Sequence, residues 1–367
     1  MIPFLSFNYQ LETHSEELIL AVESVIKSKW YVLGKNVTEF EENYSKLNGI
    51  NYTVGVGSGL DALIISLKAL NISKEDEVIV ASNAYIASWL AITSVGAKII
   101  PVEPDLRTFN LDANKIEEKI TSKTKAIIPV HLYGQPCEMD KIMAIATKYN
   151  LYVVEDNAQA HLAKYNNQIT GSFGNINATS FYPTKNIGAI GEAGCITTQN
   201  LRLSEYATKY RNYGSSEKYF CDIIGSNSRL DELQAAILNV KLKYIEKWTS
   251  ERQIIAKKYD QLLSKNSKIT IPYIDPKAQH VYHLYVIKVE KRDQLQQFLK
   301  EKGIGTAIHY PIPPHLQKAY AYLDYNKGDF PIAEELANNS LSLPLYPGLK
   351  DDNLFHISTS INEFFKN

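Results

Sequence analysis

A glycine-rich segment near the start of the chain could bind a phosphate group. The segment Gly55-Val-Gly57-Ser58-Gly59-Leu60-Asp61-Ala62 runs from an apolar strand pattern into a helical one. Such a turn presents backbone N–H groups and the positive end of a helix dipole, both of which suit a phosphate. The segment lacks the complete G-x-G-x-x-G and P-loop patterns, so it supports neither a dinucleotide site nor a nucleoside-triphosphate site.

Two further segments carry an acid and a base. Asp156 closes the apolar run Leu151–Asp156, and ligands of open α/β sheets bind beyond the carboxyl ends of strands. Lys185 follows the segment beginning at Ser180 and leads into the glycine-rich Gly188–Gly194. Taken singly, each has an ordinary structural explanation, because such an Asp is usually a cap or a turn residue and such a Lys is usually solvated.

Together the three segments predict a single ligand that carries a phosphate, a cationic ring nitrogen and an aldehyde. Pyridoxal phosphate (PLP) has all three groups. A carboxylate such as Asp156 would keep the pyridine nitrogen protonated, so that the ring can accept electrons from a carbanion. A buried Lys185 with a lowered pKa would form the imine and later, as a free amine, move protons.

The elements that must position these residues alternate between strands and helices. Apolar runs rich in Val, Ile and Leu, typical of strands covered on both faces, begin at Thr53, Asp76, Lys98, Lys125 and Leu151. Helical patterns lie between them, on the face Leu60, Leu63, Ile64 and Leu67 and over 116–120 and 139–149. This alternation predicts a mainly parallel sheet with right-handed crossovers.

After about residue 228 the pattern changes to a smaller α+β unit. A long helix is predicted from Leu230 to Ile245, continuing with a break near Trp248 toward Leu263. Strands are expected from His280 and over Thr306–Tyr310, with helices over 292–303 and 330–339. We expect the domain boundary near residues 245–250.

Composition and charge exclude several classes of function. The 39 Lys and Arg nearly balance the 40 Asp and Glu, which gives no support to a nucleic-acid or membrane-surface partner. Cys137, Cys195 and Cys221 are far apart, and the histidines show no metal-ligand spacing, so neither disulfides nor a metal are expected. The stretch Ala84–Val102 is too short and too polar to span a bilayer. The expected location is the cytoplasm.

Beyond these features, the chain resembles the DegT/DnrJ/EryC1/StrS family of PLP-dependent sugar aminotransferases. The resemblance covers nearly the whole length in order and includes the opening Phe4 to Trp30-Tyr31-x-x-Gly34. The other segments that carry it are GVGSGLDAL, Asn83 to Ser88, EDNAQAH (Glu155 to His161), SFYPTKNIGAIGEAG (Ser180 to Gly194), RNYGS (Arg211 to Ser215), GSNSRLDELQAA (Gly225 to Ala236) and HYPIPPH (His309 to His315).

This resemblance implies the α/β fold of the type I PLP transferases. It implies a PLP-binding large domain over 1–245, with a mainly parallel sheet of the seven-stranded type, and a small α+β domain over 246–367. It also implies a homodimer whose active sites are shared between the subunits.

The resemblance also assigns roles to residues that bind the cofactor. Lys185 would bond to the cofactor aldehyde, and Asp156 would be the partner of the ring nitrogen. Gln159 would lie near the ring or its hydroxyl, Tyr85 would stack on the ring, and the phosphate would be held by Ser58, Gly59, Leu60, Ser180 and, from the neighbouring subunit, Asn227. The chain departs from the family pattern at Leu60, where many members carry a Thr hydroxyl, at Asn157, where Ala is usual, and at Ala193, often Gly.

Further residues are expected to face the substrate. These are His309 and Tyr310, with Tyr182, Tyr219 and His315, while Lys218 and Arg211 could contact a nucleotide diphosphate. Each has an alternative: Tyr85 and Tyr182 could be core aromatics, His315 could be a surface residue, and Lys218 and Arg211 could be solvated.

The resemblance implies a transaminase that moves an amino group from glutamate to a dTDP-linked keto-6-deoxyhexose. The segments NYGSSEKY, SNSRLDELQAA and HYPIPPH and the MIPFL opening look most like the branch of the family that aminates C3. The product would serve amino-sugar and surface-polysaccharide synthesis, such as O-antigen or S-layer glycan. Amination at C4, or a sugar dehydratase of the same fold, is the alternative. A non-catalytic PLP-binding regulatory protein is a remote one, which no basic patch or DNA-binding motif supports.

Overall fold

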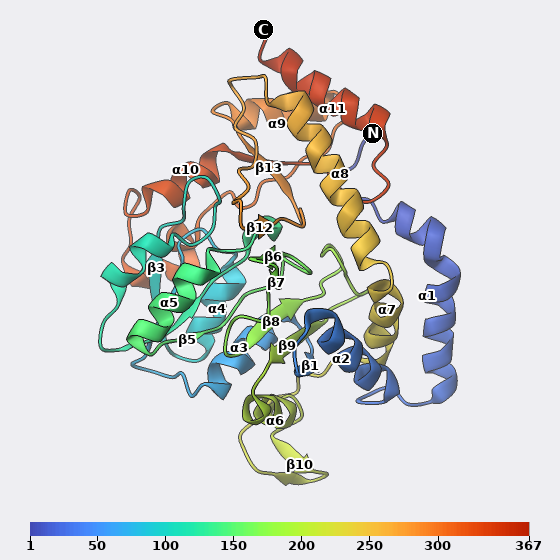
Figure 1. Ribbon diagram of the computed structural model, residues 1–367, viewed down its shortest axis with the longest axis vertical. Helices are drawn as coiled ribbons and strands as arrows, with labels where there is room; N and C mark the ends of the chain where they lie inside the picture. Colours follow the sequence, from blue (N-terminus) through green and yellow to red (C-terminus); the bar gives the residue numbers. More distant parts are fainter. Residues whose placement is uncertain (367) are drawn as a thin grey trace.

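The computed structural model describes residues 1–366, and its large part is built on a twisted sheet covered by helices (Figure 1). A parallel sheet of four strands has the order β3-β2-β4-β5, and an antiparallel sheet of three has the order β1-β9-β8. Asp156 joins them through parallel bridges to Val130 and Ala178. The strands are β1 (Tyr52–Val56), β2 (Glu77–Ala81), β3 (Lys98–Val102), β4 (Thr124–Ile128), β5 (Tyr152–Val153), β8 (Asn177–Ser180) and β9 (Gly194–Thr198).

The direction of the strands confirms a mainly parallel sheet, with one exception. Strand β9 runs antiparallel to both of its neighbours, β1 and β8. The expected parallel strand at Thr53 therefore lies at the sheet edge as β1, where its ladder is antiparallel. This edge places the turn after β1 beside the end of β8, which leads to Lys185.

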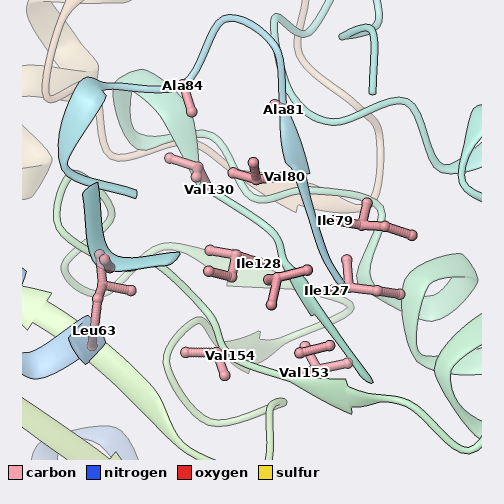
Figure 2. Packing of buried hydrophobic residues seen from close by; sticks show 14 of the residues in the cluster. Leu63, Ile79, Val80, Ala81, Ala84, Ile127, Ile128, Val130, Val153 and Val154 are labelled. Atoms are coloured by element: carbon pink, nitrogen blue, oxygen red, sulfur yellow. The ribbon is translucent and has the colours of Figure 1, made fainter. Parts of the chain in front are cut away.

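A continuous apolar core fixes the sheet against its helices. Figure 2 shows Ile79 and Val80 of β2 packed beside Ile127 and Ile128 of β4, with Leu63 reaching in from a covering helix. All five side chains are at most 2% exposed. The helices of this part are α1 (Asn8–Ser28), α2 (Lys35–Asn48), α3 (Gly59–Ala69), α4 (Ile86–Ser94), α5 (Met139–Tyr149), α6 (Leu201–Tyr210) and α7 (Glu232–Leu242).

The C-terminal part contains long helices around a two-stranded ladder of β13 with β14. Its elements are α8 (Ile245–Leu263), β13 (Tyr285–Lys288), α9 (Arg292–Glu301), α10 (Pro331–Asn339), β14 (Ser340–Leu343) and α11 (Asp351–Phe364). The helix break falls at Lys243-Tyr244 and not near Trp248, which is buried inside α8.

Smaller elements complete the description. Two hairpin-like pairings are β6 (Lys164–Tyr165) with β7 (Gln168–Ile169), to which β12 (Ala278–Gln279) adds, and β10 (Ser215–Glu217) with β11 (Phe220–Cys221). Short 3-10 turns are η1 (Ala113–Lys115), η2 (Glu117–Lys119), η3 (Leu132–Gly134), η4 (Pro314–Leu316) and η5 (Lys318–Leu323).

Two expected elements are wrong. Residues 116–120 form no α-helix but contain the 3-10 turn η2, because so short a stretch barely completes one α-helical turn and nucleation is unfavourable. Thr306–Tyr310 is not a strand, since only Ala307 pairs, in a bridge to Ser342. The His309 carbonyl instead accepts from the Tyr133 hydroxyl, which takes this segment out of the ladder.

The hydrophobic clusters do not divide the chain in sequence order. Ile2 pairs with Ile304 and packs in the C-terminal cluster, whereas Leu284, Val286 and Leu336 pack in the cluster of the large sheet. The division at residues 245 and 246 stays a prediction. Among the described residues, none of the helices has the length and apolarity that crossing a membrane requires, and no cluster of three His, Cys, Asp or Glu side chains could hold a metal ion.

Candidate active site

The turn from β1 into α3 forms a cradle in which backbone and hydroxyl groups converge. Ser58 caps α3, and its Oγ accepts from the N–H of Asp61 at 3.1 Å. A Cβ on Gly59 would lie 2.5 Å from the Cβ of Ser180, and one on Gly194 would lie 2.4 Å from the backbone of Ser58. Only glycines permit this close approach. The first N–H groups of α3, which have no partner within the helix, therefore lie beside the Ser180 hydroxyl, a donor set that fits a phosphate.

Asp156, three residues beyond the end of β5, is held at both carboxylate oxygens. Its side chain accepts from the Ala158 N–H at Oδ1 (3.1 Å) and from the Ser88 hydroxyl at Oδ2 (2.7 Å). Asp156 is 5% exposed and Ser88 is fully buried. Because each carboxylate oxygen can accept more than one hydrogen bond, Asp156 retains capacity for a protonated ring nitrogen.

Lys185 follows β8 at the same edge of the sheet. Burial lowers the pKa of Lys185 to about 8, and the negative charge of Asp156 opposes this by raising it. The amine therefore approaches the poised state that a proton-transferring or nucleophilic lysine needs near neutral pH.

Two buried histidines surround Lys185, and neither was expected to belong to the site. Burial, with the charge of Lys185 second, lowers the pKa of His161 to about 3 and lowers that of His283 well below its usual value. His161 Nε2 donates to the Ser180 carbonyl (3.0 Å), so its Nδ1 is unprotonated. His283 is hydrogen-bonded to Asn186, the residue after Lys185, at 3.2 Å. These two histidines are therefore neutral and add no positive charge beside Lys185.

The segment His309-Tyr310 reaches back from the C-terminal part and covers the residues predicted to hold the ring. The Tyr310 hydroxyl accepts from Gln159 Nε2 (3.1 Å), and its ring centroid lies 4.9 Å from that of Tyr85. His309 Nδ1 lies 2.8 Å from Ser342 Oγ. Burial, followed by the charge of Lys185, lowers the pKa of His309 to about 4, so this imidazole is neutral at physiological pH.

Other residues expected at the site lie elsewhere in this chain. His315 is buried, with its Nε2 3.1 Å from Glu334 and its ring packed on Phe330, and its contact with the substrate stays a prediction. Arg211 is unavailable to a nucleotide, since its guanidinium is paired with Glu41 and the Gly55 carbonyl.

Three expected residues are displayed on the surface, and a fourth is half exposed. Lys218 and Tyr219 lie at the tip of the β10–β11 hairpin, which projects below α6 in Figure 1, and Tyr219 is 86% exposed. Asn227 is exposed and donates to the Tyr213 hydroxyl at 3.0 Å. Tyr182, three residues before Lys185, is 45% exposed. Tyr85 is 47% exposed beside Tyr310, and its stacking on the cofactor ring stays a prediction.

The residues present fit pyridoxal phosphate. The cradle at Ser58–Leu60 and Ser180 matches the phosphate, Asp156 matches a protonated pyridine nitrogen, and the Lys185 amine matches an aldehyde. The signal that could have revealed Ser88 is its spacing of three from Tyr85, which puts both residues on one turn of helix.

Comparison with known proteins gives the same result. The model of the DegT/DnrJ/EryC1/StrS aminotransferase family matches residues 12–362. The chain is 46% identical, over 99% of both chains, to dTDP-3-amino-3,6-dideoxy-alpha-D-galactopyranose transaminase of Aneurinibacillus thermoaerophilus. It is 39% identical to dTDP-3-amino-3,4,6-trideoxy-alpha-D-glucose transaminase of Streptomyces venezuelae, over 99% of this chain and 96% of the other.

A solved structure extends the likeness to three dimensions. S. venezuelae DesV, in complex with a ketimine intermediate, superposes with a TM-score of 0.98 at 39% identity, covering 100% of this chain and 99% of the other. The fold expected of a type I PLP transferase is confirmed. The chain belongs to the DegT/DnrJ/EryC1/StrS aminotransferase family and is a PLP-dependent aminotransferase.

Proposed function

We propose that this enzyme transfers an amino group from glutamate to C3 of a dTDP-linked 3-keto-6-deoxyhexose. The observation that carries this proposal is the 46% identity, over 99% of both chains, to a transaminase named for a dTDP-3-amino-3,6-dideoxy-galactose. The S. venezuelae relative is named for a different sugar, but its name shares the dTDP group, the amine at C3 and the deoxy C6. The proposal keeps the features that both names share. The product class suits a cytoplasmic step in surface-polysaccharide synthesis.

Each residue of the site has a defined task in this reaction. The cradle of Ser58, Gly59, Leu60 and Ser180 would anchor the phosphate, and Asp156 would hold the ring nitrogen protonated. When bound, PLP supplies an aldehyde to bond the amino group and a ring that accepts electrons from the adjacent carbon.

Lys185 and the covering segment act on the substrate itself. With its pKa lowered to about 8, Lys185 Nζ can take a proton from one carbon and return it to another, as a general base and then a general acid. His309 and Tyr310 cover the ring position and would exclude water while contacting the sugar. Neutral His309 can offer either a donor or an acceptor to a sugar hydroxyl.

We infer further that two copies of the chain share their active sites. Asn227 and the hairpin residues Lys218 and Tyr219 are exposed in one chain. In a dimer they would complete the partner's site, with Asn227 on the phosphate and the hairpin on the nucleotide.

The deciding experiment is a half-reaction with the enzyme in its pyridoxamine form. dTDP-3-keto-6-deoxyhexose and the 4-keto isomer are offered separately, and the visible absorbance of the pyridoxal form is followed. We expect recovery with the 3-keto sugar only. Recovery with the 4-keto sugar alone would move the amination to C4, and recovery with neither would overturn the substrate class. The Lys185→Ala variant is the control, since it should restore no absorbance at a comparable rate.

A further inference from the structure

The buried hydroxyl of Ser88 is the side-chain group that donates a hydrogen bond to the Asp156 carboxylate. Ser88 Oγ donates to Asp156 Oδ2 at 2.7 Å, the shorter of the two hydrogen bonds that this carboxylate accepts. Both side chains are almost completely shielded from water, with exposures of 0% and 5%. A hydroxyl that donates to a carboxylate in such surroundings forms a strong, charge-assisted bond.

The carboxylate plane of Asp156 depends on this bond. Rotation about the last side-chain torsion of an Asp is loosely restricted, so one contact does not define the plane. The Ala158 N–H, which comes from the same turn, holds Oδ1. Ser88, from a helix 68 positions earlier, supplies the second point. The two hydrogen bonds together fix the carboxylate plane, and with it the direction in which the remaining oxygen lone pairs of Asp156 point.

The same helix carries the aromatic ring expected to stack on the cofactor. Tyr85 is the N-cap residue of α4, and the Ser88 N–H donates to the Tyr85 carbonyl at 3.1 Å. Ser88 therefore ties the Tyr85 turn to the Asp156 carboxylate through one residue. A stacking ring and a partner for the ring nitrogen need a fixed mutual geometry, because both contact one flat molecule.

We propose that Ser88 is a positioning residue for PLP, which fixes the Asp156 carboxylate relative to Tyr85. It acts through Asp156 and does not contact the cofactor. The inference rests on the proposed role of Asp156, but not on the identity of the sugar substrate.

The test measures cofactor binding without any substrate. Apo-enzyme of the Ser88→Ala variant is titrated with PLP by calorimetry, and the visible circular dichroism of the bound cofactor is recorded, since that signal reports the orientation of the ring in the protein. We expect the Kd to rise roughly tenfold to a hundredfold, as for loss of a hydrogen bond to a charged group, and the dichroism per bound cofactor to fall.

Two further variants separate positioning from general damage. Ser88→Cys keeps the shape but offers only a weak S–H donor, so it should resemble Ser88→Ala and provides a reading if the Ala variant does not fold. Ser358→Ala removes another buried helical hydroxyl, one without a hydrogen-bond partner within residues 1–366, and should match the wild type in both measurements. Wild-type Kd and dichroism in Ser88→Ala or Ser88→Cys would overturn the proposal. A failed reaction with dTDP-sugars would leave this result untouched, so the two proposals fail separately.

Discussion

At the scale of single residues, Lys185 shows how the fold changes ordinary chemistry. Burial lowers its pKa to about 8, and Asp156 offsets only part of that effect. A solvated lysine would be almost wholly protonated at neutral pH, whereas a pKa of about 8 leaves about a tenth of Lys185 as the free amine at pH 7. The neighbouring histidines are neutral, so they add no positive charge that would have to be balanced.

The rate of cofactor capture by apo-enzyme should therefore rise with pH and level off above about pH 8. Below that value the free-amine fraction falls about tenfold for each pH unit, so capture at pH 6 should be about a hundredfold slower than the plateau. Stopped-flow absorbance measures this rate directly. Lys185→Arg, which stays protonated, should capture no cofactor covalently and should have no turnover at any pH. A midpoint near 10.5 would contradict the lowered pKa.

The residues found by sequence and those missed differ in how they are connected. Asp156 follows an apolar run, and Lys185 leads into a glycine-rich segment, so local pattern points to both. Ser88, His161 and His283 join the site through contacts with residues far away in the sequence, such as the one between Ser88 and Asp156. The burial of His315 has the same origin, because its partner Glu334 lies on another helix. Single-residue spacing carries no information about such pairs.

At the scale of elements, the β1–α3 turn is the feature most directly dictated by residue size. Gly59→Ala should weaken PLP binding at least tenfold, since the new Cβ would lie 2.5 Å from Ser180 Cβ and must force the cradle apart. Fluorescence titration of the apo-enzyme gives the Kd. Gly49→Asn is a suitable control: Gly49 has a φ of +62 with open space around it, and Asn tolerates that conformation. Equal affinities for both variants would show that the cradle is not the phosphate site.

A second element is held in place by a single carboxylate. Glu103, just beyond β3, accepts from the N–H groups of Ile332 (2.7 Å) and Ala333 (3.1 Å) in the first turn of α10, and from Ser82. Helix α10 leads into β14, whose Ser342 is hydrogen-bonded to His309. Glu103 therefore connects the large sheet to the segment that covers the site.

Glu103→Ala should lower the free energy of unfolding by about 1–2 kcal/mol, because the first turn of α10 loses its cap. Urea unfolding of the apo-enzyme measures the change. Glu118→Ala removes an exposed carboxylate and should stay within about 0.5 kcal/mol of the wild type. If the Glu103 variant is as stable as the Glu118 variant, the Glu103 carboxylate does not stabilise the first turn of α10.

The elements themselves were predictable to different degrees. Strands β1 to β5 were predicted because they are nearly continuous apolar runs that end in turns. Strands β8 and β9 were not predicted, because Asn177–Ser180 and Gly194–Thr198 are short and largely polar. The antiparallel direction of β9 and the irregular segment Thr306–Tyr310 could not be predicted either, because both depend on partners. His309 lies outside the ladder and contacts Tyr133 and Ser342, and local strand propensity does not predict such tertiary contacts.

At the scale of the whole molecule, the exposed position of Asn227 raises the question of which site it serves. Its side-chain amide donates to the Tyr213 hydroxyl, although a phosphate role was expected of it. If two chains exchange this residue, each site combines Lys185 of one subunit with Asn227 of the other. A homodimer that lacks Lys185 should then be inactive because both sites lose the amine, and one that lacks Asn227 should be inactive because both sites lose a phosphate contact.

Mixing two inactive variants tests this arrangement. Lys185→Ala lacks the essential amine, and Asn227→Asp places a carboxylate against the phosphate, where like charges repel. After subunits are exchanged in equal amounts, half of the dimers are hybrids, and each hybrid has one site with both native residues, so about a quarter of wild-type activity should return. The control mixes the Asn227→Asp protein with a Lys185→Ala/Asn227→Asp double variant, in which no native Asn227 exists and no activity should return. If the first mixture stays inactive although hybrids are isolated, Asn227 serves its own subunit's site, and the shared-site proposal is wrong.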